Sequence, residues 1–346
     1  MPGASLAWIE DGRTVAVRGF GSVDAAGPEP VTPETAFLAG SISKHVTTVA
    51  ALRLASDGLL DLDRDVNGYL SEWRMPTEPG HPATARMLLS NLGGLADRPQ
   101  LSDGYHRHDV VPSLLDVLHG RSPARTPAVE LAQQPGTEFR QNSLNFSVLQ
   151  QAMTELTGES YPELTRRLVF EPLGMTGSSF DPCWPDTEGR PFAHGHDADG
   201  RQVPAGYYAN PEPAAGGLWT TAADLAALAA ELRRCYLGRE RGLVATELVR
   251  EMLTPQSGRA YGWSTILDTT GGDLEFGHGG QAYGYQAMTW MRVHSGRGLV
   301  MLSNAVTGRE LIRHLIATEL SGRIRLTGEW QRAIEEAVGR ERGGAA

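Results

Sequence analysis

The two ends of the chain carry the hydrophobic pattern of β-strands. Residues 4–10 (ASLAWIE) and 13–20 (RTVAVRGF) are apolar or alternating stretches on either side of an Asp-Gly pair, and this arrangement predicts a β-hairpin. The last third of the chain repeats the pattern, which predicts strands at 260–268, 274–280, 285–293 and 298–304.

The middle of the chain places its apolar residues at helical spacing. A helix is predicted from about Ser41 to the polar stretch SDGLLDLD, and others over 143–158 and 220–238, the last capped by Thr221. Residues 71–136 are rich in Pro, Gly and His and carry only short helical patterns. A final amphipathic helix is predicted from the spacing of Leu311, Ile312, Leu315 and Ile316.

A β-rich start and end around a helical middle favour one architecture. We expect an α/β (α+β) protein in which both termini build an antiparallel β-sheet flanked by helices, with an all-helical domain inserted between them. The predicted division is 1–60 and 240–346 for the sheet domain and 61–239 for the inserted helical domain.

Composition and charge exclude several classes of protein. The formal net charge of −10 argues against a nucleic-acid binder, which needs a basic face. No apolar run approaches the roughly 18 residues of a membrane helix, and no secretory signal is visible, so we expect a cytoplasmic protein without a membrane partner. Cys183 and Cys235 are interpreted as two ordinary thiols.

One lysine, Lys44, stands among the 31 lysine and arginine residues. Ser41 lies three residues earlier, so both side chains share one face of the predicted helix. A serine hydroxyl is a poor nucleophile until a base takes its proton, and burial at a helix N-terminus lowers the pKa of a lysine from about 10.4. Because arginine cannot lose its proton at usable pH, the lone lysine indicates a base for Ser41.

Other short patterns point to cofactors only weakly. His106 with His108, and His194 with His196 and its acidic neighbours, lie in polar loops without a complete ligand set, so we predict no metal site. No G-x-G-x-x-G follows a predicted strand, so no nucleotide cofactor is expected either. The oligomeric state stays open.

An ordered series of segments resembles the serine β-lactamase and penicillin-binding-protein family, in the branch of class C β-lactamases, DD-peptidases and esterases. The segments are FLAGSISKHVTTVAALRLASDGLLDLDRDVNGYL, MLLSNLGGL, PGTEF, EPLGMTGSSF, AAGGLWTTAADLAAL, YGW and FGHGGQAYGY. The resemblance implies a β-lactamase/transpeptidase-like fold with a site in the groove between its two parts.

The resemblance also implies roles for individual residues. Ser41 would be the acylated nucleophile and Lys44 its proton partner. His278, Gly279 and Gly280 match the H-x-G triplet of the strand that lines the site. The backbone N–H groups of Ser41 and Gln281 would form the oxyanion hole, which stabilises negative charge on the carbonyl oxygen.

The chain departs from the family at the second motif, Tyr-x-Asn. The sequence PGTEFRQNSLNF places Gln141 at the tyrosine and Ser143 at the asparagine, where both would contact substrate. Glutamine cannot accept and return a proton near neutral pH. Tyr161, Tyr283 or Tyr285 could reach the site in space.

The family also usually carries a helix before the segment that matches MPGASLAWIE, and none precedes it here, so either the sheet edge is covered otherwise or the natural start lies upstream.

These observations predict serine-dependent acyl transfer through a Ser41 acyl-enzyme. Hydrolysis of an ester or amide in a small molecule or peptide is the first expectation. The loss of the motif tyrosine leaves two alternatives open: an acyltransferase or cyclase that disfavours water, or a degenerate member that binds a ligand without turnover.

Overall fold

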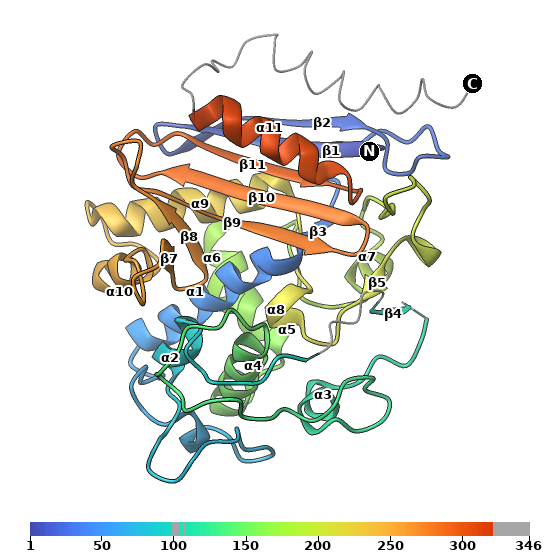
Figure 1. Cartoon of the computed structure of the whole chain (residues 1–346). Coiled ribbons are helices and arrows are strands. Elements are labelled where there is room, and N and C mark those ends of the chain that lie inside the picture. The colour runs from blue at the N-terminus through green and yellow to red at the C-terminus, as the bar shows by residue number, and fades with distance from the viewer. Residues whose placement is uncertain (99–103, 107, 321–346) are drawn as a thin grey trace.

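The computed structural model describes residues 1–98, 104–106 and 108–320. Its main feature is a seven-stranded antiparallel sheet in the order β2-β1-β11-β10-β9-β8-β7 (Figure 1). The strands are β1 (Gly3–Glu10), β2 (Arg13–Gly21), β7 (Tyr261–Gly262), β8 (Thr265–Asp268), β9 (Glu275–Ala282), β10 (Tyr285–Arg292) and β11 (Gly298–Ser303). The prediction of an antiparallel sheet built from both termini is confirmed.

The first hairpin forms because its turn suits the twist of the strands. Asp11 and Gly12 both have positive φ, at 50° and 74°, as a two-residue turn between right-twisted strands requires. Strand β1 then pairs with β11, joining the start of the chain to its end.

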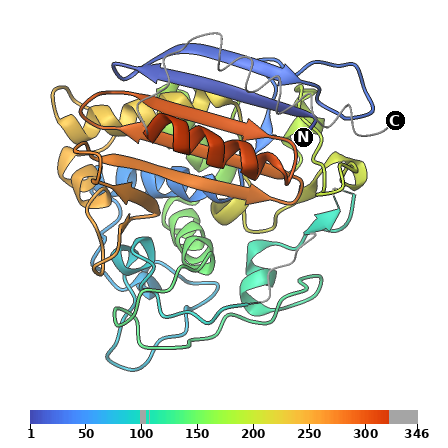
Figure 2. The same cartoon turned by 45° about the horizontal axis from the view of Figure 1, so that its top comes forward.

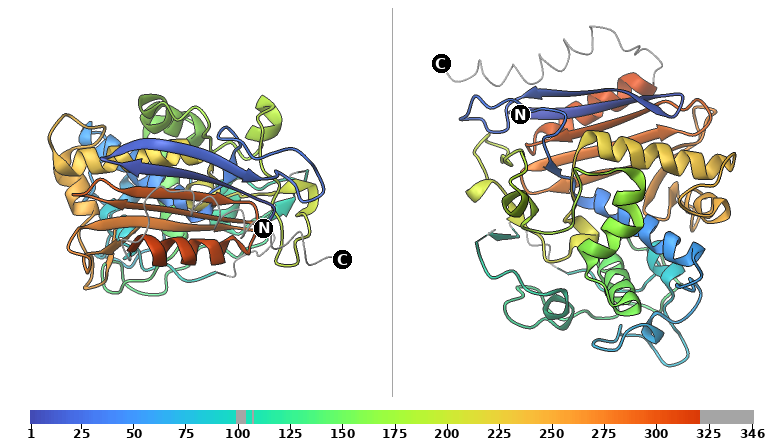
Figure 3. Two further views of the ribbon diagram at one scale, coloured as in Figure 1. Left: turned by 90° about the horizontal axis from the view of Figure 1, so that it is seen from above. Right: turned by 180° about the vertical axis from the view of Figure 1, so that it is seen from behind.

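Helices cover both faces of this sheet. Helix α11 (Gly308–Leu320) lies on one face, and α9 (Ala222–Leu237) packs against strands β1, β2, β10 and β11 on the other (Figures 2 and 3). Thr221 caps α9 by accepting a hydrogen bond from the backbone N–H of Asp224, as the sequence predicts. The sequence-based division assigns α9 to the inserted helical part, whereas the helix packs on the sheet. The division into two domains stays a prediction.

The remaining elements are mainly short. The helices are α1 (Ser43–Ser56), α2 (Ala85–Leu89), α3 (Leu114–His119), α4 (Leu144–Thr157), α5 (Tyr161–Thr165), α6 (Glu171–Leu173), α7 (Trp184–Glu188), α8 (Pro213–Gly216) and α10 (Thr246–Met252). Short turns of helix are η1 (Gly40–Ile42), η2 (Val66–Gly68), η3 (Arg166–Phe170) and η4 (Pro204–Gly206), and two small ladders pair β3 (Phe37–Leu38) with β6 (Trp219–Thr220) and β4 (Tyr105–His106) with β5 (Tyr208–Ala209).

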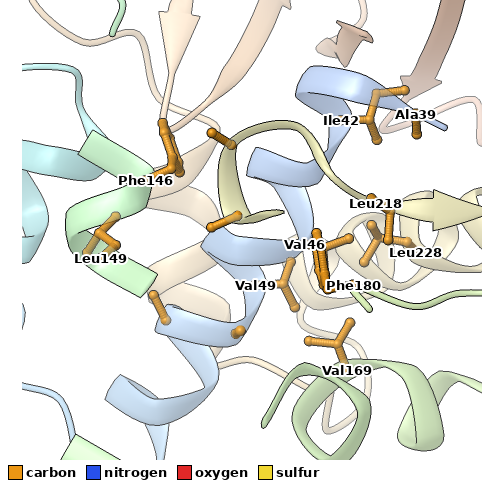
Figure 4. Close-up of a cluster of buried hydrophobic side chains, with 14 of the residues drawn as sticks. Ala39, Ile42, Val46, Val49, Phe146, Leu149, Val169, Phe180, Leu218 and Leu228 are labelled. Carbon is orange, nitrogen blue, oxygen red and sulfur yellow. The ribbon is translucent and has the colours of Figure 1, made fainter. Parts of the chain in front are cut away.

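Helix α1 is the buried centre of the molecule. Val46 and Val49 pack among side chains from the helical half and from the segments beside the sheet (Figure 4). Their neighbours in this cluster include Phe146, Leu149, Val169, Phe180, Leu218 and Leu228. A helix buried on all sides fixes whatever projects from its first turn, because a close-packed interior leaves little room for movement.

The prediction of one strand over 260–268 is wrong. Residues 261–268 form a tight hairpin in which β7 pairs with β8 across Trp263 and Ser264. Ser264 has a φ of 50°, which reverses the chain. Trp263 is fully buried, so an apolar run that resembles a strand contains a turn anchored in the core.

Candidate active site

Ser41 lies in the turn η1, immediately before helix α1. The residue before it, Gly40, has a φ of 51°, and a Cβ there would come within 2.6 Å of the backbone of Gln281. Glycine at position 40 therefore allows the turn to lie directly against strand β9. The helix begins at Ser43, slightly later than the sequence predicts, and Ser41 is half-buried at its start.

Lys44 contacts Ser41 directly. Its Nζ donates to Ser41 Oγ at 2.8 Å and to the carbonyl oxygen of Ala215 at 2.9 Å. The lysine is only 4% exposed. Burial lowers its pKa from 10.5 to about 8, although the charge of Glu212 acts in the opposite direction. The geometry and the pKa are those of an amine that can take a proton from the serine hydroxyl.

Two polar contacts hold the segment that presents the Ala215 carbonyl. Ser43 Oγ accepts from the backbone N–H of Leu218, and Thr47 Oγ1 donates to the carbonyl oxygen of Ala214. Both side chains come from α1, so one helix supplies the lysine and fixes the group that the lysine contacts.

His278 lies on β9 and is buried at 4% exposure. Its ring meets that of His45 edge-to-face at 5.3 Å between centroids. Burial, followed by the charges of His45 and Lys44, holds the pKa of His278 well below its usual range. Burial likewise lowers the pKa of His45 to about 4. Both imidazoles are therefore neutral at pH 7.

The glycines after His278 differ in their surroundings. A Cβ on Gly280 would come within 1.9 Å of the carbonyl oxygen of Ala39, whereas a Cβ on Gly279 would meet nothing within 4 Å. Strand β8 pairs with β9 only as far as Gly277, so among the described strands none pairs with the following stretch on that side. The structure thus brings Ser41, Lys44, His278 and Gln281 together beside an open length of strand.

The altered second motif lies at the start of helix α4. Gln141 is exposed, and its Nε2 donates to the hydroxyl of Tyr261 at 3.3 Å. Ser143 is the residue before the helix, and its side chain makes no capping hydrogen bond. Asn142 between them is buried and donates to the carbonyl oxygens of Leu95 and Ala96, which makes it a structural residue.

An ion pair lies next to this motif. Arg98 donates to Glu212 at 3.0 Å, and Ser147 of α4 donates to the same carboxylate oxygen at 2.7 Å. Glu212 directly precedes α8, and its negative charge is the one that acts on Lys44.

Residues 1–320 match the family model described as Beta-lactamase. The chain belongs to the Beta-lactamase family. Among solved structures it is similar to SurE, at 25% identity with a TM-score of 0.73, covering 94% of this chain and 73% of that one. It is also similar to the octameric penicillin-binding protein homologue from Pyrococcus abyssi, at 26% identity and a TM-score of 0.71, over 88% of this chain and 70% of that one.

A D-aminopeptidase from Gluconobacter oxydans is 29% identical over 181 residues, which are 50% of this chain and 31% of that protein. The chain spans about a third of the length of the curated relatives that it matches. The predicted resemblance and the predicted fold are both confirmed.

The Beta-lactamase-family site lacks a tyrosine at position 141, and the three tyrosines considered from the sequence lie elsewhere. The Tyr161 hydroxyl is 2.7 Å from Thr47 Oγ1 in the core, and Tyr285 donates to the carbonyl oxygens of Ala193 and Gly206. Tyr283 is 40% exposed and packs against Tyr208. The phenol that does reach the motif is that of Tyr261, which contacts Gln141. Tyr261 is not among the site residues predicted from the sequence, although it is the first residue of the segment YGW, which matches the family.

The two histidines of the segment HGHDADG have a structural partner. His194 and His196 both contact Asp24, at 3.2 and 3.4 Å. Within residues 1–98, 104–106 and 108–320, no group of three or more His, Cys, Asp or Glu side chains is arranged to hold a metal ion. In the same part of the chain, no helix is both long and apolar enough to cross a membrane.

Proposed function

We propose that this chain is a serine hydrolase that forms an acyl-enzyme on Ser41. The observation that carries the proposal is the 2.8 Å contact between Lys44 Nζ and Ser41 Oγ, made by an amine with a pKa of about 8. Lys44 takes the hydroxyl proton as Ser41 Oγ bonds to the substrate carbonyl carbon, and then gives that proton to the leaving group.

The open stretch of β9 supports the way in which a substrate would bind. A peptide or acyl chain lying along Gly279 and Gly280 can pair with the strand, and the Gly40 turn keeps the Ser41 N–H close to the backbone of Gln281. Two N–H groups at this position would stabilise the oxyanion of the tetrahedral intermediate.

The substrate class that we propose is an amide or ester of a small amino acid or short peptide. The name of the D-aminopeptidase relative makes D-configured substrates the first to test. A second candidate is acyl transfer to an amine or hydroxyl of the substrate itself, which the exposed Gln141 favours because it puts no phenol at the motif position.

The first test is intact-protein mass spectrometry after exposure to a fluorophosphonate, activated esters and a β-lactam. We expect a covalent adduct on the wild type and on Ser56→Ala, a matched serine at the far end of α1, but not on Ser41→Ala. Lys44→Arg should react at least 100-fold more slowly, since its side chain stays protonated. Absence of an adduct with every probe would instead support a ligand-binding protein without turnover.

The substrate class is tested with paired D- and L-amino acid p-nitroanilides and methyl esters. Faster release from the D compounds supports the proposal, and equal release contradicts it. Products analysed in the presence of an added amine separate hydrolysis from acyl transfer, because a transferase yields the amide in preference to the free acid.

A further inference from the structure

Tyr261 lies where a phenol can serve the site, although it comes from a different element than the missing motif tyrosine. Its hydroxyl is 3.3 Å from Gln141 Nε2 and 3.4 Å from His278 Nε2. It therefore joins the altered motif to the histidine of the glycine-rich strand. Both separations are long for hydrogen bonds, and such contacts commonly shorten when substrate binds.

The directions of these hydrogen bonds follow from the groups around them. His278 Nδ1 contacts the carbonyl oxygen of Gly279, which can only accept, so Nδ1 carries the ring proton and Nε2 is the acceptor. Tyr261 must then donate its hydroxyl proton to His278 Nε2. The phenolic oxygen keeps a lone pair, which accepts from the amide of Gln141. Protons can therefore move along this series of hydrogen bonds in one direction only, toward His278.

The local fold holds the phenol in this position. The β7–β8 turn places Tyr261 on the edge strand, level with Gly277 of β9, because Tyr261 pairs with Ile266 of β8 and Ile266 pairs with Gly277. Phe139 packs edge-to-face on the tyrosine ring at 5.6 Å. Phe139 and Gln141 belong to one segment, so the same stretch of chain supports the ring and orients the hydroxyl.

We infer that Tyr261, positioned by Gln141 and hydrogen-bonded to His278, activates the acyl acceptor that releases the product from Ser41. The inference rests on the acyl-enzyme proposed above. It assigns Tyr261 as a catalytic residue of the second half-reaction and Gln141 as a positioning residue, and it makes the replacement at 141 compatible with turnover by water.

The protons balance in this step. As the acceptor oxygen bonds to the acyl carbon, its proton passes to Tyr261, and Tyr261 passes its own proton to His278 Nε2. Acylation leaves Lys44 neutral, and it regains a proton from solvent because its pKa of about 8 lies above pH 7. The bond between Ser41 Oγ and the acyl carbon then breaks while this ammonium donates a proton to Oγ, across the 2.8 Å contact. Lys44 is neutral again for the next acylation, and His278 returns its extra proton to solvent.

Burial and the charges around His278 keep its imidazole neutral, with Nε2 free to accept a proton. Lys44 and His45 face it from α1, Tyr261 faces it from β7, and Glu212 adds a negative charge beside Lys44. Burial raises the pKa of Tyr261, so the phenol holds its proton until His278 accepts it. A neutral His278 is available as an acceptor throughout the neutral pH range.

The experiment measures acylation and deacylation separately with p-nitrophenyl acetate, by the release of nitrophenol and by the lifetime of the acetylated protein in mass spectrometry. We expect Tyr261→Phe to acylate within about threefold of the wild type but to lose its acetyl group about 100-fold more slowly. Gln141→Leu, which removes the positioning amide, should slow deacylation about 10-fold. The control Tyr285→Phe, which removes a phenol that donates to the carbonyl oxygens of Ala193 and Gly206 away from the site, should deacylate at the wild-type rate.

A purely structural role for Tyr261 would not alter the pH dependence. The wild-type deacylation rate should fall in acid as His278 becomes protonated, and the slow residual rate of Tyr261→Phe should be flat over the same range. Gln141→Tyr combined with Tyr261→Phe should recover at least a tenth of the wild-type deacylation rate, because a phenol returns to the motif position.

The outcomes separate this inference from the proposal on which it depends. If the wild type forms no acetyl-enzyme, the proposed function and this inference both fail. If it forms one and the Tyr261→Phe adduct has the wild-type lifetime, only this inference is overturned. Circular dichroism establishes that each variant is folded, and a misfolded Tyr261→Phe leaves Gln141→Leu to decide: an unchanged lifetime there also overturns the inference.

Discussion

Lys44 provides the most direct physical test of the site, because it is the chain's single lysine. Uniform labelling with ¹⁵N-lysine therefore gives one side-chain amine signal. Titration of that signal should show an inflection near the pKa of about 8 that burial produces, instead of the ordinary 10.5. At pH 7 about one-tenth of the amine is then neutral, which is roughly 300-fold more than for an exposed lysine.

The same pKa predicts the rate of acylation. If the neutral amine takes the Ser41 proton, the acylation rate should rise about tenfold between pH 7 and pH 9, with its midpoint at the titration midpoint of Lys44. Glu212→Gln removes the negative charge that raises the pKa of Lys44, so both midpoints should move to lower pH together. A Lys44 inflection above pH 10, or an acylation rate that stays constant over this range, would refute the assignment of Lys44 as the base.

Three further predictions concern stability. Lys44→Met should raise the free energy of unfolding at pH 7 by about 1 kcal/mol, since it removes a buried charge that costs about 3 kcal/mol but also loses two hydrogen bonds of about 1 kcal/mol each. The folded-state pKa of Lys44 lies below its unfolded value, so the wild type gains stability as pH rises from about 8 to 10.5, and this gain should vanish in Lys44→Met when urea melts are compared. Gly280→Ala should cost about 1–3 kcal/mol because its Cβ collides with the Ala39 carbonyl, whereas the neighbouring Gly279→Ala should stay within about 0.5 kcal/mol; equal costs in the two melts would contradict the packing described for β9.

The sequence predicts the parts of the site that follow from short-range spacing. Ser41 and Lys44 lie three residues apart at a helix start, so their contact follows from local geometry alone. The pairing of β1 with β11 requires a contact between opposite ends of the chain, yet hydrophobic patterns at both ends indicate one sheet. The local spacing and the shared sheet are therefore enough to predict one site that contains both the turn at Ser41 and the strand of His278.

Tyr261 could not be found in this way. Its segment AYGWSTILD has the composition of a continuous strand, and a continuous strand would carry Tyr261 away from the other residues of the site. The reversal depends on the positive φ of Ser264 and on the burial of Trp263, and neither is encoded in the period of apolar residues. Tertiary packing decides the turn, and the turn decides where the phenol lies.

The organisation of α1 explains why a costly buried amine is tolerated at this place. The helix presents Lys44 to Ser41 and to the Ala215 carbonyl, and its next turn holds the preceding carbonyl, that of Ala214, through Thr47. Loss of the Thr47 hydroxyl would free the segment that accepts a hydrogen bond from Lys44. If Lys44 then moves by about 1 Å, the acylation rate falls, because the base is no longer correctly oriented toward the Ser41 hydroxyl. The fully buried Thr47 therefore belongs to the chemistry of the site although it touches neither Ser41 nor substrate: Thr47→Val should slow acylation while leaving the pKa of Lys44 depressed.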